Sequence, residues 1–294
     1  MLFGMKELCV LIINYNSSLD TFNLISDLQK SNYTNFDVLV FDNGSKEDLS
    51  NLEKIKNITF IKNNENLGFT GGVNKALNFI KSKYVLLLNP DIIIDDNALK
   101  ELLDLIKNDE KIAFAAGSIY NFIDKNKVDS FGGKMNFLTG IGRPLINETE
   151  IRELKYGEYT DACILIFNKE IFQKLGSYDE RYFMYVETED IQFKAMKNCY
   201  KVFIDPKAKV WHKVYGSSGG RKSKRAVYYL TRNRFLFIKK HVNIFNYVIF
   251  LFLNLFGILP LQFLLFLKRR HFDLLGAFFL GIYDGIRQKN DRLV

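Results

Sequence analysis

Residues 7–16 read ELCVLIINYN, a run of apolar residues that ends in three polar ones. An uninterrupted apolar run of this kind indicates a strand that is buried on both faces, because a strand with one face in water alternates apolar and polar side chains. The polar residues Asn14, Tyr15 and Asn16 follow at the carboxyl end of the expected strand. In sheets of buried parallel strands, this is the end where ligands bind.

Three more short apolar runs follow the same pattern, with helical segments between them. The expected strands are FDVLVF at 36–41, NITFI at 57–61 and YVLLL at 84–88, and the expected helices are 18–31, 48–54 and 70–82. Strands that alternate with helices are typical of βαβ units, whose strands are parallel. The sequence therefore predicts an α/β fold with a mostly parallel, doubly wound sheet and a Rossmann-like nucleotide-binding half.

Each of the four expected strands is followed by a cluster of polar residues. The clusters are NYN at 14–16, DNGS at 42–45, NNENLGFTGGVN at 63–74 and NPD at 89–91. Asn offers both donors and acceptors, and Gly lets a ligand approach the main chain closely. One such cluster alone is most often a surface turn. Because all four are expected at the same edge of the sheet, together they favour a binding site.

The C-terminal third of the chain is basic and contains a long apolar run. Up to Pro206 the chain has 24 Lys and Arg against 30 Asp and Glu, whereas from Lys207 onward it has 17 against 3. The run at 244–267 has 24 residues without a charge. At about 1.5 Å per residue, a helix of this length is long enough to cross the roughly 30 Å apolar core of a bilayer.

We therefore expect 241–294 to be a helical, membrane-associating tail. A second apolar segment at 274–286 leaves two arrangements open, a hairpin that lies in the membrane and a true span. The alternative is a core helix of a soluble protein, although such helices are usually shorter.

The basic block at 207–240 narrows the class of partner. It contains eleven Lys or Arg, which suits phosphate, nucleic acid or an anionic membrane surface. Because the block adjoins the apolar run, we expect lipid headgroups and no nucleic acid. The three cysteines lack pairing or metal-ligand spacing, and the N-terminus lacks the pattern of a secretory signal. The expected location is the cytoplasmic face of the cell membrane, as at a bacterial inner membrane.

Taken together, the motifs resemble those of the inverting nucleotide-sugar glycosyltransferases of glycosyltransferase family 2, particularly the rhamnosyltransferase-like branch. The resemblance covers roughly residues 7–240 through VLIINYNS, VFDNGS, NENLGFTGGVN, LLLNPD, GSYDERYFMYVETED and HKVYGSSGG. It implies a GT-A fold, a nucleotide-diphosphate sugar donor, a divalent metal (Mg²⁺ or Mn²⁺) and a glycan or lipid-linked acceptor in cell-surface polysaccharide synthesis. Rhamnose is a frequent donor sugar of the branch.

On this resemblance we expect residues 1–240 to be the catalytic domain, ahead of the tail at 241–294. We expect its nucleotide-sugar-binding half to be 1–117 and its acceptor half to be 118–240.

Transfer from such a donor releases a nucleoside diphosphate, whose negative charge a divalent metal can neutralise. Asp91, directly after the strand at 84–88, offers a hard oxygen ligand, and Asn89 lies two residues before it. NPD stands where many relatives have two aspartates, so we expect metal binding to depend more on the diphosphate and on a second protein ligand. The resemblance places His212 near the metal. The alternatives are that Asp91 caps a helix and that His212 is structural.

The remaining polar residues are expected to hold the donor. Asp42 can accept a hydrogen bond from the N–H of a uracil or thymine ring, and the resemblance gives it that role. Arg232, with Arg234 nearby, can bind diphosphate oxygens of the donor or of a lipid carrier. The expected nucleotide-sugar contacts are Asn14, Tyr15, Asn16, Asp42, Asn43, Asn66, Gly68, Phe69, Asn74, Asn89 and Arg232.

The acceptor hydroxyl needs a general base, and the carboxylates of YVETEDIQFK at 185–194 are the candidates. Relatives have the pattern Glu-Asp, any residue, Asp-Leu here. An alignment without gaps matches Glu187 and Asp190 but puts Thr188 at the position of the base, and a shift of two residues would pair Glu189 with Asp190. We expect Glu187 to be the base, with Asp190 second and Glu189 as the further candidate. The alternative is a solvated acidic helix start.

Two other classes of function stay open from the sequence. A nucleotidyltransferase would share the sheet and the metal, but we would expect a glycine-rich loop with Lys or Arg after its first strand, where this chain has NYNSSLD. A non-catalytic membrane or nucleic-acid binding module would keep Asp91 and the 187–190 carboxylates as relics. Donor hydrolysis separates the transferase from both.

Overall fold

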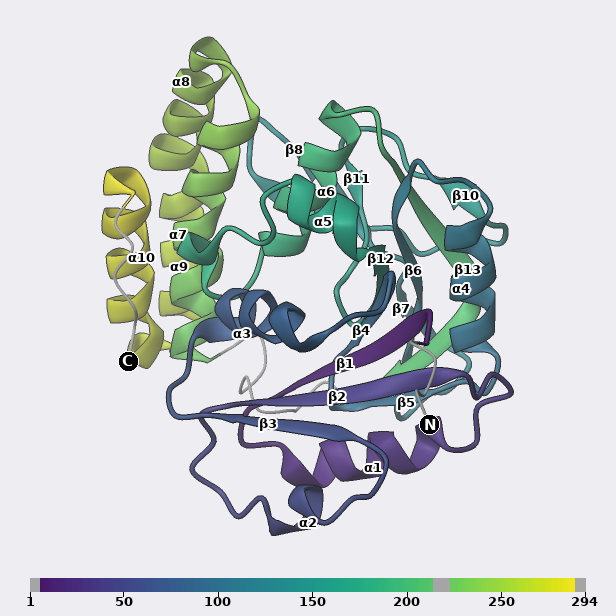
Figure 1. Cartoon of the computed structure of the whole chain (residues 1–294). Helices are drawn as coiled ribbons and strands as arrows, with labels where there is room; N and C mark the ends of the chain where they lie inside the picture. The colour runs from purple at the N-terminus through teal and green to yellow at the C-terminus, as the bar shows by residue number, and fades with distance from the viewer. Residues whose placement is uncertain (1–5, 214–222, 289–294) are drawn as a thin grey trace.

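The computed structural model describes residues 6–213 and 223–288, and its centre is one large β-sheet with helices on both faces (Figure 1). The strands lie in the order β10-β13-β6-β12-β4-β1-β2-β3, with β5 paired to β13 and β7 paired to β6. A smaller sheet has the order β11-β8-β9. The bounds are β1 Leu8–Asn14, β2 Phe36–Asn43, β3 Thr59–Asn63, β4 Tyr84–Leu88, β5 Ile92–Ile94, β6 Ile112–Asn121, β7 Val128–Ser130, β8 Gly133–Asn136, β9 Ile141–Pro144, β10 Arg152–Glu153, β11 Glu158–Tyr159, β12 Ile164–Asn168 and β13 Lys201–His212.

The four strands expected from the sequence are present and parallel to one another. Strand β1 pairs with β2 and with β4, and β2 pairs with β3. Strand β12 then enters antiparallel to β4, with Ile164 opposite Leu88. The predicted α/β fold is confirmed, and β12 makes the sheet mixed. Because β12 runs the other way, its first residues lie at the edge where β1, β2 and β4 end.

Strand β1 is buried on both faces, as its apolar run predicts. Alternate residues belong to different cores: Leu8, Val10 and Ile12 pack in the layer with α1 and α4. The residues between them pack in the layer with α3, α5 and α6. The helix bounds are α1 Ser18–Leu28, α2 Ser50–Glu53, α3 Gly68–Ala76, α4 Ala98–Lys107, α5 Lys169–Lys174, α6 Glu187–Lys197, α7 Lys224–His241, α8 Ile244–Leu253, α9 Leu259–Lys268 and α10 Leu275–Arg287, with short 3-10 turns η1 Leu77–Phe79, η2 Glu180–Tyr182 and η4 Phe272–Leu274.

Helices α8 and α9 form one continuous apolar helix, joined by the π-helical turn η3 Asn254–Ile258. Together they span Ile244–Lys268, a helix of 25 residues. Its most apolar stretch of 18 residues has a mean hydropathy of 2.3, and 17% of that stretch is buried. In the part of the chain that the structure describes, this is the one helix long and apolar enough to cross a membrane. The predicted division into 1–240 and 241–294 stays a prediction.

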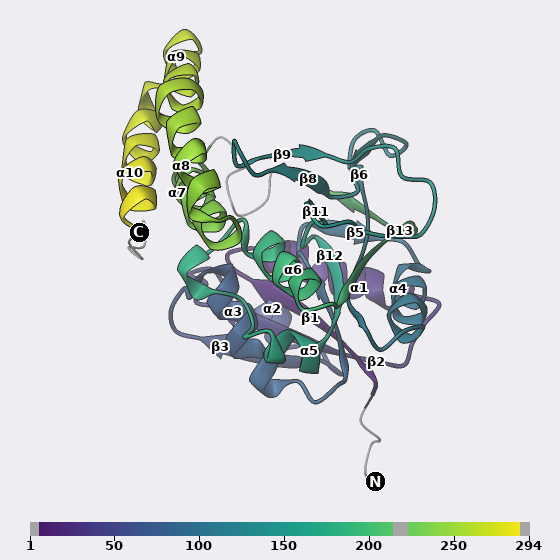
Figure 2. The same cartoon turned by 90° about the horizontal axis from the view of Figure 1, so that it is seen from above.

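The buried residues of this helix form one stripe. Tyr247, Phe250, Asn254 and Leu259 are buried at successive spacings of three, four and five residues. A plain α-helix keeps a stripe with spacings of three and four. The extra residue of the π turn therefore keeps Leu259 on the same side as Phe250. Most of the other side chains of this helix are exposed, and Figure 2 shows α9 protruding beyond the sheets with α10 beside it.

The first prediction concerns Gly117, in the middle of β6. A Cβ added there would lie 2.1 Å from the carbonyl oxygen of Ala208 in β13, where the register shifts between Ile204 and Lys209. Gly117→Ala should lower the free energy of unfolding by about 2 kcal/mol or more, because main chain must move to admit the methyl group. Chemical denaturation monitored by circular dichroism measures this loss.

Gly276→Ala is the matched control, because a Cβ there meets nothing within 4 Å. In a helix Ala is favoured over Gly by about 1 kcal/mol, so this variant should be as stable as the wild type or more stable. Equal stability of the two variants would contradict the predicted close approach of β6 and β13.

Candidate active site

The clusters after β1 and β2 meet through a network of hydrogen bonds at the carboxyl edge of the sheet. Asn14 donates to Asp42 Oδ1 at 2.8 Å, and Ser45 donates to the same oxygen from its hydroxyl and to Oδ2 from its amide. Both Asn14 and Asp42 are fully buried, whereas Tyr15 is half-buried and Asn16 is exposed. The described contacts of Asp42 thus close the DNGS turn, and its role at a base stays a prediction.

The cluster after β3 is organised by Asn43. Its side chain donates to the carbonyl of Gly68 at 2.9 Å and accepts from the amide of Leu67 at 3.1 Å. Asn66 in turn accepts from the amide of Gly68 at 2.8 Å. These bonds hold the loop that leads into α3.

The glycines of this loop make room for another part of the same chain. Gly68 has a φ of +76°, and a Cβ there would lie 2.4 Å from the ring of Phe183. Asn74 donates to the carbonyl of Tyr178 at 2.9 Å and accepts from its amide at 3.1 Å, while Phe69 lies with its ring 6.0 Å from that of Tyr178. The stretch 63–74 therefore braces the segment 178–183, which precedes α6. Contacts of these residues with a donor stay a prediction.

The two residues predicted to bind metal lie side by side. Asp91 follows β4, and His212 ends β13, which pairs with β5 so that His212 is opposite Ile92. The Asp91 Oδ1 and His212 Nε2 atoms are 3.3 Å apart, and both side chains are partly exposed. Asn89 is half-buried beside them, with its amide bonded to the carbonyl of Cys163.

The chemistry of this pair fits a divalent ion. Mg²⁺ and Mn²⁺ take carboxylate oxygen, Mn²⁺ accepts imidazole as well, and Mg²⁺ sites usually have few protein ligands. Among residues 6–213 and 223–288, no group of three or more His, Cys, Asp and Glu is placed to hold an ion by itself. That the diphosphate supplies further ligands stays a prediction.

Asp161 is an acidic residue at this edge of the sheet that the sequence did not single out. It lies just before β12, at the same edge as Asn89, and accepts from the Ser130 hydroxyl at 2.6 Å. Its charge contributes to the raised pKa of Glu189 and of Cys163. The motif TDAC before an apolar run looks like an ordinary turn, and only the antiparallel entry of β12 places it here.

Two of the three candidate base carboxylates have perturbed pKa values. Burial raises the pKa of Glu187 to about 7, with a smaller contribution from Asp190. Burial and the neighbouring Glu187 raise the pKa of Glu189 to about 8. Glu187 is 6% exposed, and its Oε2 has no hydrogen-bond partner among the described residues. A carboxylate with a pKa near 7 and a vacant oxygen can accept a proton at neutral pH.

Asp190, the second candidate, is fully engaged by other side chains. Its Oδ1 is 2.7 Å from His241 Nε2 and accepts from the Tyr182 hydroxyl at 3.1 Å, and its Oδ2 accepts from Lys240 at 2.6 Å. The side chain is 4% exposed. Asp190 thus links α6 to the end of α7. The assignment of the base to Glu187, with Glu189 as the further candidate, stays a prediction.

The backbone immediately before α6 is strained. Phe183, Tyr185 and Val186 have φ values of 63°, 68° and 70°, which non-glycine residues rarely adopt and a β-branched residue like valine avoids. Each costs of the order of 1 kcal/mol or more and persists only where its surroundings fix it.

Helix α7 fixes this segment. Asn233 donates to the carbonyls of Tyr182, Met184 and Tyr185 at 2.8 to 3.0 Å. Arg232 donates to the carbonyls of Arg181 and Tyr182 and is 2% exposed. Arg232 therefore supports the segment in front of Glu187, and its predicted contact with diphosphate stays a prediction. Arg234 donates to Asn254 at 3.2 Å.

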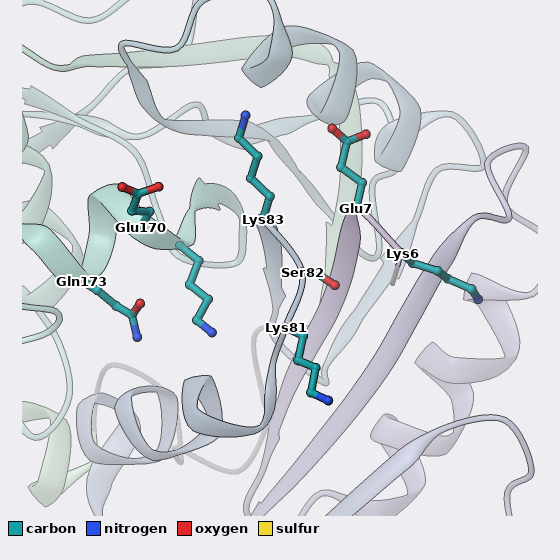
Figure 3. Close-up of a pocket in the computed structure, with 8 residues that line it drawn as sticks. Lys6, Glu7, Lys81, Ser82, Lys83, Glu170 and Gln173 are labelled. Carbon is teal, nitrogen blue, oxygen red and sulfur yellow. The ribbon is translucent and has the colours of Figure 1, made fainter. Parts of the chain in front are cut away.

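One hollow lies away from this site, at the opposite edge of the sheet. Figure 3 shows Glu7 before β1, Lys83 before β4, and Glu170 and Gln173 in α5 around it. Only the amino ends of β1 and β4 reach this hollow, so it has no connection to the predicted site. The glycine-rich stretch 216–220, predicted beside His212, lies outside the described residues.

Comparisons with known proteins identify the family. Residues 9–176 match the model of the family described as glycosyl transferase family 2. The low-salt glycan biosynthesis hexosyltransferase Agl10 of Haloferax volcanii is 25% identical over 238 residues, 79% of this chain and 75% of that protein. The N-acetylglucosaminyl-diphospho-decaprenol L-rhamnosyltransferase of Mycobacterium tuberculosis is 25% identical over 210 residues, 62% of this chain and 68% of that protein.

A solved structure shows the fold. The mannosyltransferase PcManGT of Pyrobaculum calidifontis, determined in complex with GDP-Man and Mn²⁺, has a TM-score of 0.62 and 12% identity, and the match covers 98% of this chain and 89% of that one. This likeness confirms the GT-A fold. The family model spans more than half of the sequence, and the chain therefore belongs to glycosyltransferase family 2.

Proposed function

We propose that this glycosyltransferase moves a sugar from a nucleotide-diphosphate donor to a glycan or lipid-linked acceptor, with inversion at the sugar carbon and with the help of a divalent metal. The observation that carries the proposal is the Asp91–His212 pair, whose carboxylate and imidazole lie 3.3 Å apart beyond the end of β4. The raised pKa of Glu187, about 7, supports it. The relatives support glycan synthesis as the setting. Rhamnose is the donor sugar we favour, because one relative is named as a rhamnosyltransferase.

The donor would lie across the ends of β1, β2 and β4. The expected nucleotide contacts are on β1 and β2, and Asp91 follows β4, so a nucleoside on the first pair would direct its diphosphate toward the Asp91–His212 pair. A bound divalent ion would neutralise the charge that develops on the leaving diphosphate. Asp91 and His212 would hold that ion.

Glu187 would act as the base. A hydroxyl becomes a good nucleophile when its proton is removed during attack on the sugar carbon opposite the diphosphate, which gives inversion. Burial keeps Glu187 poorly solvated, and the raised pKa matches a base that works near neutral pH. The neighbouring Asp190 makes a smaller contribution to this raised pKa.

We further propose that the protein works at the cytoplasmic face of the cell membrane. The apolar helix Ile244–Lys268 is largely exposed; it ends in Lys268, and Arg269 and Arg270 follow directly. A lipid-linked acceptor would then be delivered in the plane of the membrane. The M. tuberculosis relative, whose name includes diphospho-decaprenol, supports an acceptor of this class.

The second prediction tests the metal site. Asp91→Asn should abolish sugar transfer and metal-stimulated donor hydrolysis, because it removes the charged ligand of the pair. Its free energy of unfolding should stay within about 1 kcal/mol of the wild type, as expected of a partly exposed polar residue. Transfer assays at varied Mn²⁺ and Mg²⁺, with thermal unfolding in parallel, measure both.

Asp96→Asn is the matched control, because Asp96 is exposed on the same segment. It should keep wild-type activity. Full activity of Asp91→Asn, or of the wild type in excess chelator, would rule out the metal mechanism.

The third prediction tests the base. Glu187→Gln should lower turnover by a factor of about 10² or more with little change in donor binding, since a general base acts in the transition state. Glu170→Gln, at the opposite edge of the sheet, should leave turnover unchanged. If Glu189→Gln is inactive while Glu187→Gln is active, Glu189 is the base. Steady-state kinetics with a donor-binding titration separate these results.

The fourth prediction concerns pH and stability. In the unfolded chain both glutamates have a pKa near 4.5, whereas in the fold the values are about 7 for Glu187 and about 8 for Glu189. Above pH 4.5 the folded state therefore binds more protons than the unfolded state, so stability falls as pH rises through these values. Glu187→Gln should be more stable than the wild type by about 1 to 3 kcal/mol at pH 8.

At pH 4 the same variant should gain nothing, because both carboxyls are then protonated in either state. Denaturation curves at the two pH values provide the measurement. An equal gain at both pH values would show that burial of charge is not the cause.

A further inference from the structure

The long apolar helix returns along the catalytic body. Helix α7 ends at His241, and Asn243 caps α8 by accepting from the amide of Asn246 at 2.9 Å. Phe250 then packs edge-on against Phe235 of α7, with ring centroids 5.4 Å apart. Further along the apolar helix, Asn254 accepts a hydrogen bond from Arg234, which precedes Phe235 in α7. Later residues of the apolar helix thus contact earlier residues of α7, so α8 lies beside α7 and antiparallel to it.

Helix α10 then runs back beside α9, in the opposite direction. The rings of Phe263 and Phe279 are 5.6 Å apart, and those of Phe266 and Phe278 are 5.3 Å apart, so α9 and α10 are antiparallel neighbours. The chain reverses between them, in the segment after Lys268. The end of α9 is therefore the tip of a hairpin.

Two glycines of α10 allow it to pack closely against α7. A Cβ added at Gly281 would lie 2.8 Å from the carbonyl oxygen of Tyr228, and one at Gly285 would lie 3.1 Å from that of Arg232. The spacing of four residues is the pattern that lets two helices approach closely. Tyr228 also donates to Asp284 at 2.8 Å. The end of α10 is thus fixed on α7.

Helix α7 in turn belongs to the catalytic body. Asn233 holds the strained segment before Glu187, and Lys240 and His241 hold Asp190 in α6. The helix carries six Lys or Arg residues, which cannot enter the apolar core of a bilayer at acceptable free energy. The body, α7 and the end of α10 must therefore lie on the same side of the membrane.

These contacts are incompatible with a span. If α8 and α9 crossed the bilayer, Lys268–Arg270 would lie on the far side, and α10 would have to cross back to reach α7. Helix α10 has 13 residues, or about 20 Å, against an apolar core of roughly 30 Å. It is too short to cross back.

Resting on the proposed membrane association, the geometry points to a hairpin that stays in one leaflet and does not cross the bilayer. Helices α8 to α10 lie in the leaflet that faces the catalytic body, and Lys268–Arg270 stay at its headgroups. The outer face suits lipid, because its exposed side chains are apolar; they are Ile244, Phe245, Val248, Phe252, Phe256, Leu261, Leu264, Phe279 and Leu280. The basic residues Lys239, Lys268, Arg269 and Arg270 are exposed at both ends of this face, which favours an anionic leaflet.

Cysteine labelling tests the inference on the full chain in its native membrane. Cys199 is exposed on the body, whereas Cys9 and Cys163 are buried, so Cys199 reports the side of the catalytic domain. Arg269→Cys in a Cys199→Ser background reports the side of the hairpin tip. Each protein is treated with a membrane-impermeant maleimide in inverted membrane vesicles and in intact spheroplasts.

The expected result is that Arg269→Cys and Cys199 are labelled in the same preparation and protected in the other. Arg287→Cys, at the end of α10, should behave in the same way. Labelling of Arg269→Cys from the opposite face, or only after detergent is added, would overturn the one-leaflet hairpin while leaving membrane association intact. Release of the wild-type protein from membranes by high salt would instead remove the membrane association itself.

Discussion

The site and the C-terminal helices both depend on how the chain is held just before α6. Three residues there, Phe183, Tyr185 and Val186, have left-handed backbone conformations that they would not keep in isolation. One amide side chain, that of Asn233, binds three carbonyls of the segment. From the other side, Thr70 donates its amide to the Phe183 carbonyl. The position of Glu187 follows from these bonds, because α6 begins where the strained segment ends.

The sequence was most informative about the parallel half of the sheet. Apolar runs predict the strands at 8–14, 36–43, 59–63 and 84–88. Because these strands are parallel, their carboxyl ends share one edge of the sheet, which is where ligands bind in such folds. Asp91 and His212, both named as metal ligands from the sequence, lie 3.3 Å apart, while their role at a metal stays a prediction. These features could be predicted because they depend only on which segments form strands and on which residues follow the strand ends.

The partners of the amides and carboxylates could not be predicted in the same way. Asn43, Asn66 and Asn74 were expected at the donor, yet their described partners belong to the protein, and Asn74 reaches Tyr178 across 104 residues. Asp190 looked like a candidate base because it lies one turn after Glu187, but Lys240 and His241, about fifty residues later, bind it. An Asn or Asp in a sequence shows what it can bind and gives no sign of what will face it.

The π-helical turn at Asn254–Ile258 has a consequence for how this chain compares with others. Each residue of an α-helix turns the chain by about 100°, so one extra residue without extra rise shifts the angular phase of everything after it. A periodicity search that assumes a single α-helical phase from Ile244 to Lys268 would therefore place Leu259 off the stripe that contains Phe250. A relative that lacks this turn would need a one-residue gap at this point of the alignment. The gap would fall inside a helix, whereas insertions and deletions are usually found in loops.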